Sequence, residues 1–132
     1  MREWAAAVQD REVSAREMVE ASLSVIEAQE ELNAFVATDP ERSLAEADEI
    51  DSQLASGDEV GPLAGIPFGV KDLEDAAGYV TTQGSMLHAD DPPAEADSVL
   101  VERLRGAGCV VMGKTNTPEF GWTGDTLSLI HI

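Results

Sequence analysis

The chain has 132 residues, of which 26 are Asp or Glu and only eight are Lys or Arg, and its formal net charge at pH 7 is −18. So few cations argue against a direct nucleic-acid partner and against attachment to anionic membranes, because phosphate binding needs clustered Lys and Arg. The hydrophobic content of 43% is that of an ordinary globular protein. The acidic excess suits a protein adapted to high salt, where ions screen self-repulsion.

The cysteine content and the N-terminus bear on the cellular location. Cys109 is the single cysteine and cannot form an internal disulfide, which is typical of a reducing compartment. Its apolar neighbours predict an inert buried thiol. The first residues lack the apolar core of a signal peptide, and no stretch has the length of a membrane span. We therefore expect a cytoplasmic protein.

Two helices are predicted in the first half of the chain. The first extends from about Ser14 to Glu31 and begins with a capping box, in which Ser14 and Glu17 accept hydrogen bonds from each other's backbone N–H. Residues 32–38 then predict a short strand. The second helix is predicted to follow Asp39 as its N-cap and to end at Gly57.

The second half of the chain alternates between strand and helix patterns. The Gly- and Pro-rich residues 61–70 predict a strand bounded by tight turns, and residues 88–97 predict an acidic loop. A helix follows, with Asp97 or Ser98 as its N-cap. Residues 109–113 predict a buried strand, and a loop is expected from Lys114 onward. Strand, helix and strand in succession predict an α/β layered fold built around a parallel pair of strands.

Two patterns are weak candidates for binding sites. Residues 108–115 fit the Walker A pattern, but the predicted helix ends where a phosphate loop needs a strand, so we interpret the match as coincidental. His88, Asp90 and Asp91 could ligate a metal ion, but adjacent acids beside two prolines are more typical of a solvated loop. We expect no metal ion and no cofactor.

Lys71 is one of only two lysines in the chain and follows the mostly apolar run 66–70. In a structural role its ammonium would lie in water or pair with Asp72 or Asp75. In a catalytic role, burial would lower the pKa of the amine from about 10.4, so that the neutral amine could act as a base. Nearby carboxylates would oppose that shift, and local sequence leaves both roles open.

Several separated segments resemble the amidase signature family of serine hydrolases: GPLAGIPFGVKD at residues 61–72, TTQGS at residues 81–85, and residues 96–121, which include GKTNTPEFG. The resemblance covers about residues 13–126. It implies the N-terminal part of the amidase-signature fold, α/β with a mixed central sheet flanked by helices, and amide hydrolysis by a Ser-cisSer-Lys triad. Lys71 is then the catalytic lysine, acting through the cis-serine as general base. Lys114 is then structural, and Ser85 and Ser98 belong to other motifs.

The resemblance also implies that the chain is a fragment. Both triad serines of the family lie in and after a Gly-Ser-rich segment, and no such segment occurs here. We interpret residues 1–126 as the truncated N-terminal portion of an amidase domain and residues 127–132 as a non-native or out-of-frame tail. The expected function of the intact protein is hydrolysis of the C–N bond of a small carboxamide through an acyl-serine intermediate. The fragment alone is expected to be inactive.

Two alternatives stay open. The first is the glutaminase subunit of a tRNA-dependent amidotransferase, where we would expect KTNMDEF in place of the KTNTPEF of residues 114–120. That difference favours a stand-alone amidase. The second is an α/β binding or structural protein that keeps the scaffold without catalysis. The sequence identifies neither the amide nor the oligomeric state.

Overall fold

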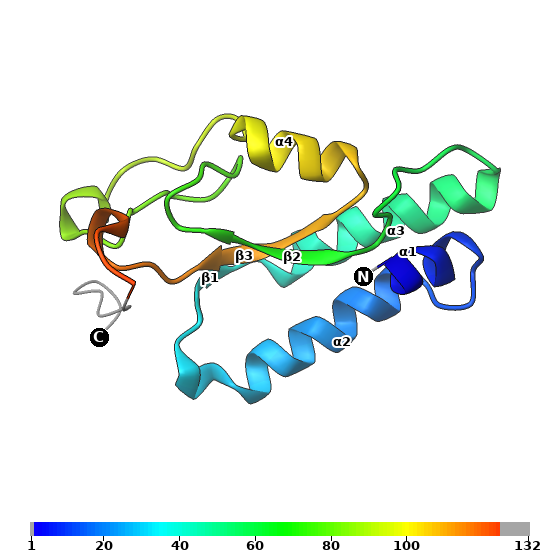
Figure 1. Cartoon of the computed structure of the whole chain (residues 1–132), viewed down its shortest axis with the longest axis horizontal. Helices are drawn as coiled ribbons and strands as arrows, with labels where there is room; N and C mark the ends of the chain where they lie inside the picture. The colour runs from blue at the N-terminus through cyan, green and yellow to red at the C-terminus, as the bar shows by residue number, and fades with distance from the viewer. Residues whose placement is uncertain (1, 125–132) are drawn as a thin grey trace. The chain divides into compact units, whose positions relative to one another are not determined.

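The structure is a computed structural model that describes residues 2–124, and Figure 1 shows its helices and strands. The helices are α1 (Arg2–Gln9), α2 (Ala15–Ala28), α3 (Pro40–Ser56) and α4 (Val99–Gly106), and the strands are β1 (Phe35–Thr38), β2 (Pro67–Lys71) and β3 (Val110–Thr115). Three short 3-10 turns are η1 (Glu30–Leu32), η2 (Met86–His88) and η3 (Glu119–Gly121). The tail predicted at residues 127–132 lies outside the described residues. No helix in the described part is long and apolar enough to cross a membrane.

The three strands form one mixed sheet in the order β1-β3-β2. β1 and β3 are antiparallel, with Phe35 opposite Thr115. β2 and β3 are parallel, because the Val110 N–H donates to Ile66 O at 2.9 Å where both strands begin, and the Asp72 N–H donates to Thr115 O at 3.0 Å where both strands end. The predicted parallel pair, joined through a helix, is confirmed.

The chain divides into two compact units. Of the described residues, 2–28, 39–68 and 103–112 form the first unit, and 29–38, 69–102 and 113–124 form the second. α4, β2 and β3 each contribute residues to both units.

In the first unit, α2 packs along α3 (Figure 1). The capping box is confirmed: the Ser14 N–H donates to the Glu17 carboxylate at 2.9 Å, and the Glu17 N–H donates to Ser14 Oγ at 3.0 Å. The Ser14 N–H and the Ser14 hydroxyl both donate to the Glu17 carboxylate, and these two hydrogen bonds lower the pKa of Glu17. Asp51 on α3 accepts from the Ala15 and Arg16 N–H groups at 2.8 and 3.1 Å, so one helix satisfies the free amides of the other.

The core of the first unit contains the lone cysteine. Cys109 is 6% exposed and packs in one cluster with Ala5 and Ile66. Burial raises the pKa of its thiol. The predicted buried position of Cys109 is confirmed.

Helix boundaries agree with the predicted caps where those caps are local. α3 begins after Asp39, whose side chain accepts from the Arg42 N–H, and it ends at Gly57 with φ of 80°. α4 begins after Ser98, while the Asp97 carboxylate accepts from the Ala77 N–H at 2.7 Å, so of the two predicted caps Ser98 is correct.

Two helix predictions were incomplete. The sequence predicted no helix before Ser14, yet α1 forms there and buries only Ala5 and Val8. Eight residues give too little periodicity for a strong amphipathic signal, and tertiary packing supplies the stability that such a short helix lacks. The first predicted helix ends at Ala28 rather than at Glu31, and η1 follows it.

β3 is longer than predicted because it pairs with β1. A loop was expected from Lys114 onward, but Lys114 lies opposite Ala37 and within β3. Gly113 permits this close approach: a Cβ at Gly113 would lie 2.1 Å from Ala37 O, and its φ of +143° is strained for any other residue. This pairing is a long-range contact that local sequence does not display.

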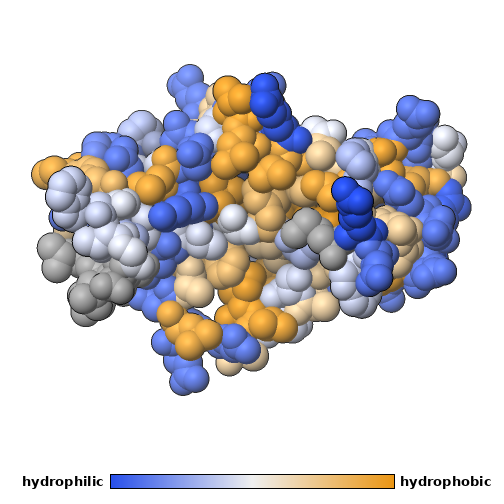
Figure 2. All heavy atoms as spheres, viewed as in Figure 1, coloured by the Kyte–Doolittle hydropathy of each residue, from blue (hydrophilic) through white to orange (hydrophobic). Residues whose placement is uncertain are grey.

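Large apolar side chains are exposed in both units. Leu87 and Trp122 of the second unit are 79% and 89% exposed, and Trp4 of the first unit is 56% exposed. Figure 2 shows hydrophobic surface (orange) between hydrophilic side chains (blue) on one face. Exposed apolar surface of this kind is typical of faces that pack against further protein.

We predict that Gly113→Ala lowers the free energy of unfolding by at least about 2 kcal/mol, because the new methyl group would collide with the Ala37 carbonyl. The matched control is Gly106→Ala in α4, where a Cβ meets nothing within 4 Å. There a helical alanine should be neutral or stabilise by up to about 1 kcal/mol. Urea unfolding of the protein that contains this chain measures both changes, and equal effects at the two sites would contradict the prediction.

Candidate functional site

Lys71, the predicted catalytic residue, ends β2 with an exposed side chain. Its neighbours Val70 and Asp72 are 3% and 0% exposed, as strand alternation requires when one face of β2 is buried. Within residues 2–124, the Lys71 ammonium forms no hydrogen bond or ion pair. The pairing with Asp72 that the sequence allowed does not occur, because Asp72 is bound elsewhere.

Asp72 and Lys114 form an ion pair in which both side chains are fully buried. Lys114 Nζ lies 2.9 Å from Asp72 Oδ1 and donates to Thr81 Oγ1 at 2.7 Å and to Val80 O at 3.3 Å. These three acceptors match the three N–H donors of an ammonium group. The other Asp72 oxygen accepts from the Thr82 hydroxyl, and the Thr82 N–H donates to Asp72 Oδ1 at 3.3 Å. Both buried charges are therefore paired and hydrogen-bonded.

The residues Asp72, Val80, Thr81, Thr82 and Lys114, here called the Asp72–Lys114 cluster, come from three separated parts of the sequence. Asp72, the two threonines and Lys114 each lie in one of the segments that carry the family resemblance. That resemblance implied a structural role for Lys114, which agrees with its burial, but Asp72 was not singled out. The sequence did contain a signal for an acidic partner of Lys114. A lysine that lies in a buried strand needs a partner for its charge, and the chain has 26 acidic residues to supply one.

Two loops of the second unit meet beside this cluster. Ser85 Oγ donates to Glu119 Oε1 at 2.7 Å, and the Phe120 N–H donates to Gln83 O at 2.8 Å. Gln83 and Phe120 have φ values of 54° and 52°, which are uncommon for residues other than glycine. Ser85 thus has a structural role, because it joins two loops. Ser98 also has a structural role, because it caps α4.

The weaker candidate sites are not assembled in the structure. His88 Nδ1 lies 2.7 Å from Asp91 Oδ2, but within the described residues no group of three His, Cys, Asp or Glu side chains is arranged to hold a metal ion. Asp90 lies in the same loop and is exposed. The Walker A pattern also lacks its loop, because its lysine, Lys114, lies inside β3.

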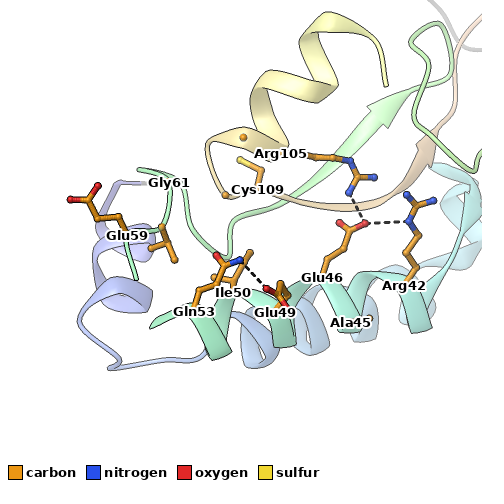
Figure 3. A pocket seen from close by; sticks show the side chains of 13 residues that line it. Arg42, Ala45, Glu46, Glu49, Ile50, Gln53, Glu59, Gly61, Arg105 and Cys109 are labelled. Atoms are coloured by element: carbon orange, nitrogen blue, oxygen red, sulfur yellow. Dashed lines mark hydrogen bonds and ion pairs between the residues drawn. The ribbon is translucent and has the colours of Figure 1, made fainter. Parts of the chain in front are cut away.

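The first unit contains an open groove of about 560 Å³ beside α3, shown in Figure 3. Glu46 lies in it and accepts from both Arg105, at 2.5 Å, and Arg42, at 3.2 Å. The second Glu46 oxygen accepts from the Val111 N–H at 3.4 Å. Glu46 therefore ties α3 to α4 and β3, and its role in the groove is structural.

The family model described as Amidase matches residues 17–130 of the chain. The chain belongs to the amidase signature family. It is 47% identical over 110 residues to a glutamyl-tRNA(Gln) amidotransferase subunit of Ralstonia nicotianae, a match that covers 83% of this chain and 22% of that protein. It is 42% identical over 125 residues to an acylamidase of Rhodococcus erythropolis, covering 94% of this chain and 26% of the relative.

A solved structure shares the fold of this amidase-family chain. It is the inhibitor-bound form of a vestigial protein complex that reveals the evolutionary origins of an s-triazine catabolic enzyme, and it superposes with a TM-score of 0.91 at 41% identity. The match covers 96% of this chain and 28% of that one. The predicted family and fold class are confirmed, and the chain spans about a quarter of the length of the curated relatives it matches.

We predict that Asp72→Asn and Lys114→Met each lower the free energy of unfolding by about 3–5 kcal/mol, because each leaves a buried charge or donor without its partner. The double variant should lose at least about 1 kcal/mol less than the sum of the two. The matched control uses Arg16→Met and Asp48→Asn in the exposed pair Arg16–Asp48, where the unfolding midpoint should barely change. Additive losses for Asp72 and Lys114 in a urea double-mutant cycle would contradict a coupled pair.

Proposed function

We propose that this chain is part of an amidase that hydrolyses the C–N bond of a carboxamide through an acyl-serine intermediate, with Lys71 as the base of a Ser-cisSer-Lys triad. The observation that carries the proposal is membership of the amidase signature family together with the position of Lys71. Lys71 ends β2 directly before the anchored Asp72, with its own side chain free of the cluster that binds Asp72.

The proposed reaction uses Lys71 only to move protons. The neutral amine accepts a proton from the cis-serine as that serine takes one from the nucleophile, whose oxygen attacks the carbonyl carbon. The proton then returns to the leaving nitrogen as the C–N bond breaks, and water hydrolyses the acyl-serine. A low-polarity surrounding would hold Lys71 neutral. Since the described residues leave Lys71 exposed, further parts of an amidase domain would supply both that cover and the two serines.

We also propose that residues 1–126 are the N-terminal portion of the domain and that residues 127–132 are not native to it. Sequencing the gene across this position tests the second statement. A reading frame that continues into a Gly-Ser-rich segment supports it, and a genuine stop after the last residue contradicts it. A cytoplasmic location is supported by the lone buried Cys109.

We predict that Lys71→Met in the whole protein lowers kcat for simple carboxamides by at least about a thousandfold, with KM little changed, because the base acts in the chemical step. Arg103→Met is the matched control, since Arg103 is an exposed cation outside the cluster. It should leave kcat unchanged. Steady-state kinetics on folded protein, checked by circular dichroism, measures both. An active Lys71→Met variant would rule out the proposed base.

A second candidate function is membership of a tRNA-dependent amidotransferase, which the 47% identity to a component of such an enzyme favours. KTNTPEF at residues 114–120, in place of KTNMDEF, favours the stand-alone amidase. We predict that amide hydrolysis by the purified whole protein does not depend on a partner protein or on charged tRNA. Glutaminase activity that appears only with both additions would reverse this order. A folded whole protein without hydrolysis under either condition would favour the non-catalytic alternative.

A further inference from the structure

We propose that the buried Asp72–Lys114 ion pair positions Lys71 for proton transfer. Neither residue would touch the substrate, so both are positioning residues. The inference rests on the proposed role of Lys71 as base, and it assigns a function in that reaction to the second of the two lysines in the chain.

Backbone hydrogen bonds hold the peptide group that joins Lys71 to Asp72 at both its N–H and its carbonyl oxygen. The Asp72 N–H donates to Thr115 O at 3.0 Å, and Lys71 O accepts from the N–H groups of Leu73 and Glu74 at 2.7 and 2.9 Å. The strand thus turns immediately after Lys71. The direction of the Lys71 side chain then depends on how firmly Asp72 is held on the opposite face.

Asp72 is held by charge and by directional hydrogen bonds. Its carboxylate accepts from Lys114 and from both the hydroxyl and the N–H of Thr82. Lys114 in turn is fixed by three acceptors at 2.7 to 3.3 Å. Such a set satisfies one arrangement only, whereas apolar side chains of similar volume pack in several ways.

Stability alone does not account for two buried charges. Removing an aspartate and a lysine from water carries a large desolvation penalty, and apolar residues of similar volume are often as stabilising as a buried ion pair. The pair is therefore best explained by the geometry that it imposes. Nearby, a Cβ at Gly69 would lie 2.4 Å from Thr115 Cγ2, so β2 and β3 also approach each other closely just before Lys71.

The test compares variants of the whole protein that remove either the charges or one hydrogen bond of the Asp72–Lys114 cluster. The double variant Asp72→Asn/Lys114→Met removes both charges, and Thr82→Val keeps the ion pair but removes one hydroxyl donor. We expect kcat to fall at least about tenfold in the double variant and several-fold in Thr82→Val, with KM within about threefold of the wild type. The control double variant Arg16→Met/Asp48→Asn, at an exposed pair, should keep wild-type kcat.

A second readout follows Lys71 directly. The rate at which acetic anhydride acetylates its amine, measured by peptide mass spectrometry across pH, reports its accessibility and its pKa. We expect the double variant and Thr82→Val to alter this profile and the Arg16→Met/Asp48→Asn control to leave it unchanged. The fraction of folded protein is measured by circular dichroism and urea unfolding in every sample.

The outcomes separate the two proposals. Wild-type kcat in the folded double variant and in folded Thr82→Val would overturn the positioning role while leaving the base intact. If the double variant does not fold, Thr82→Val decides alone. Activity retained by Lys71→Met would instead overturn the proposed function, and with it the role of the pair in proton transfer. The acetylation profile would then show only whether the pair orients the Lys71 amine.

Discussion

The second unit depends on one buried ion pair, between Asp72 and Lys114. In a chain with 26 acids and eight basic residues, one of the two lysines is removed completely from water. That is tolerable only because every donor of its ammonium group has an acceptor and its charge has a counter-charge. Any arrangement of the surrounding loops that left one of these groups unpaired would cost about 1–3 kcal/mol or more, which is a large part of the net stability of a domain.

This constraint explains why distant parts of the chain meet. Lys114 lies in β3, the middle strand of the sheet, Asp72 follows β2, and Thr81 and Thr82 belong to the loop between β2 and α4. Because the pair must be satisfied from all three segments, strand pairing and loop conformation are coupled. Glycine contributes where the strands come too close for a side chain, as at Gly113 against Ala37. The first unit is tied differently, by Glu46 with its two arginines and by Asp51 at the start of α2.

The accuracy of the predictions followed the range of the interactions involved. α3 could be predicted to the residue because its cap, its first proline and its terminal glycine are neighbours in sequence. The capping box at Ser14 was equally local. α1 was missed because its stability comes from packing, and the length of β3 was missed because Lys114 pairs with a strand formed far earlier in the chain. Of the two aspartates that could have paired with Lys71 in a structural role, Asp72 binds the other lysine instead.

The sequence by itself determined the family, the α/β class with a parallel strand pair, and the helix caps, because short-range hydrogen bonding and the order of motifs can be read along the chain. Only the tertiary structure decided which lysine is buried and which is exposed, and which aspartate meets which cation. The physical reason is that a buried charge is stable only inside a complete set of partners. For Lys114 those partners lie in segments that local sequence does not bring together, whereas Lys71 is left exposed on the opposite side of the strand end.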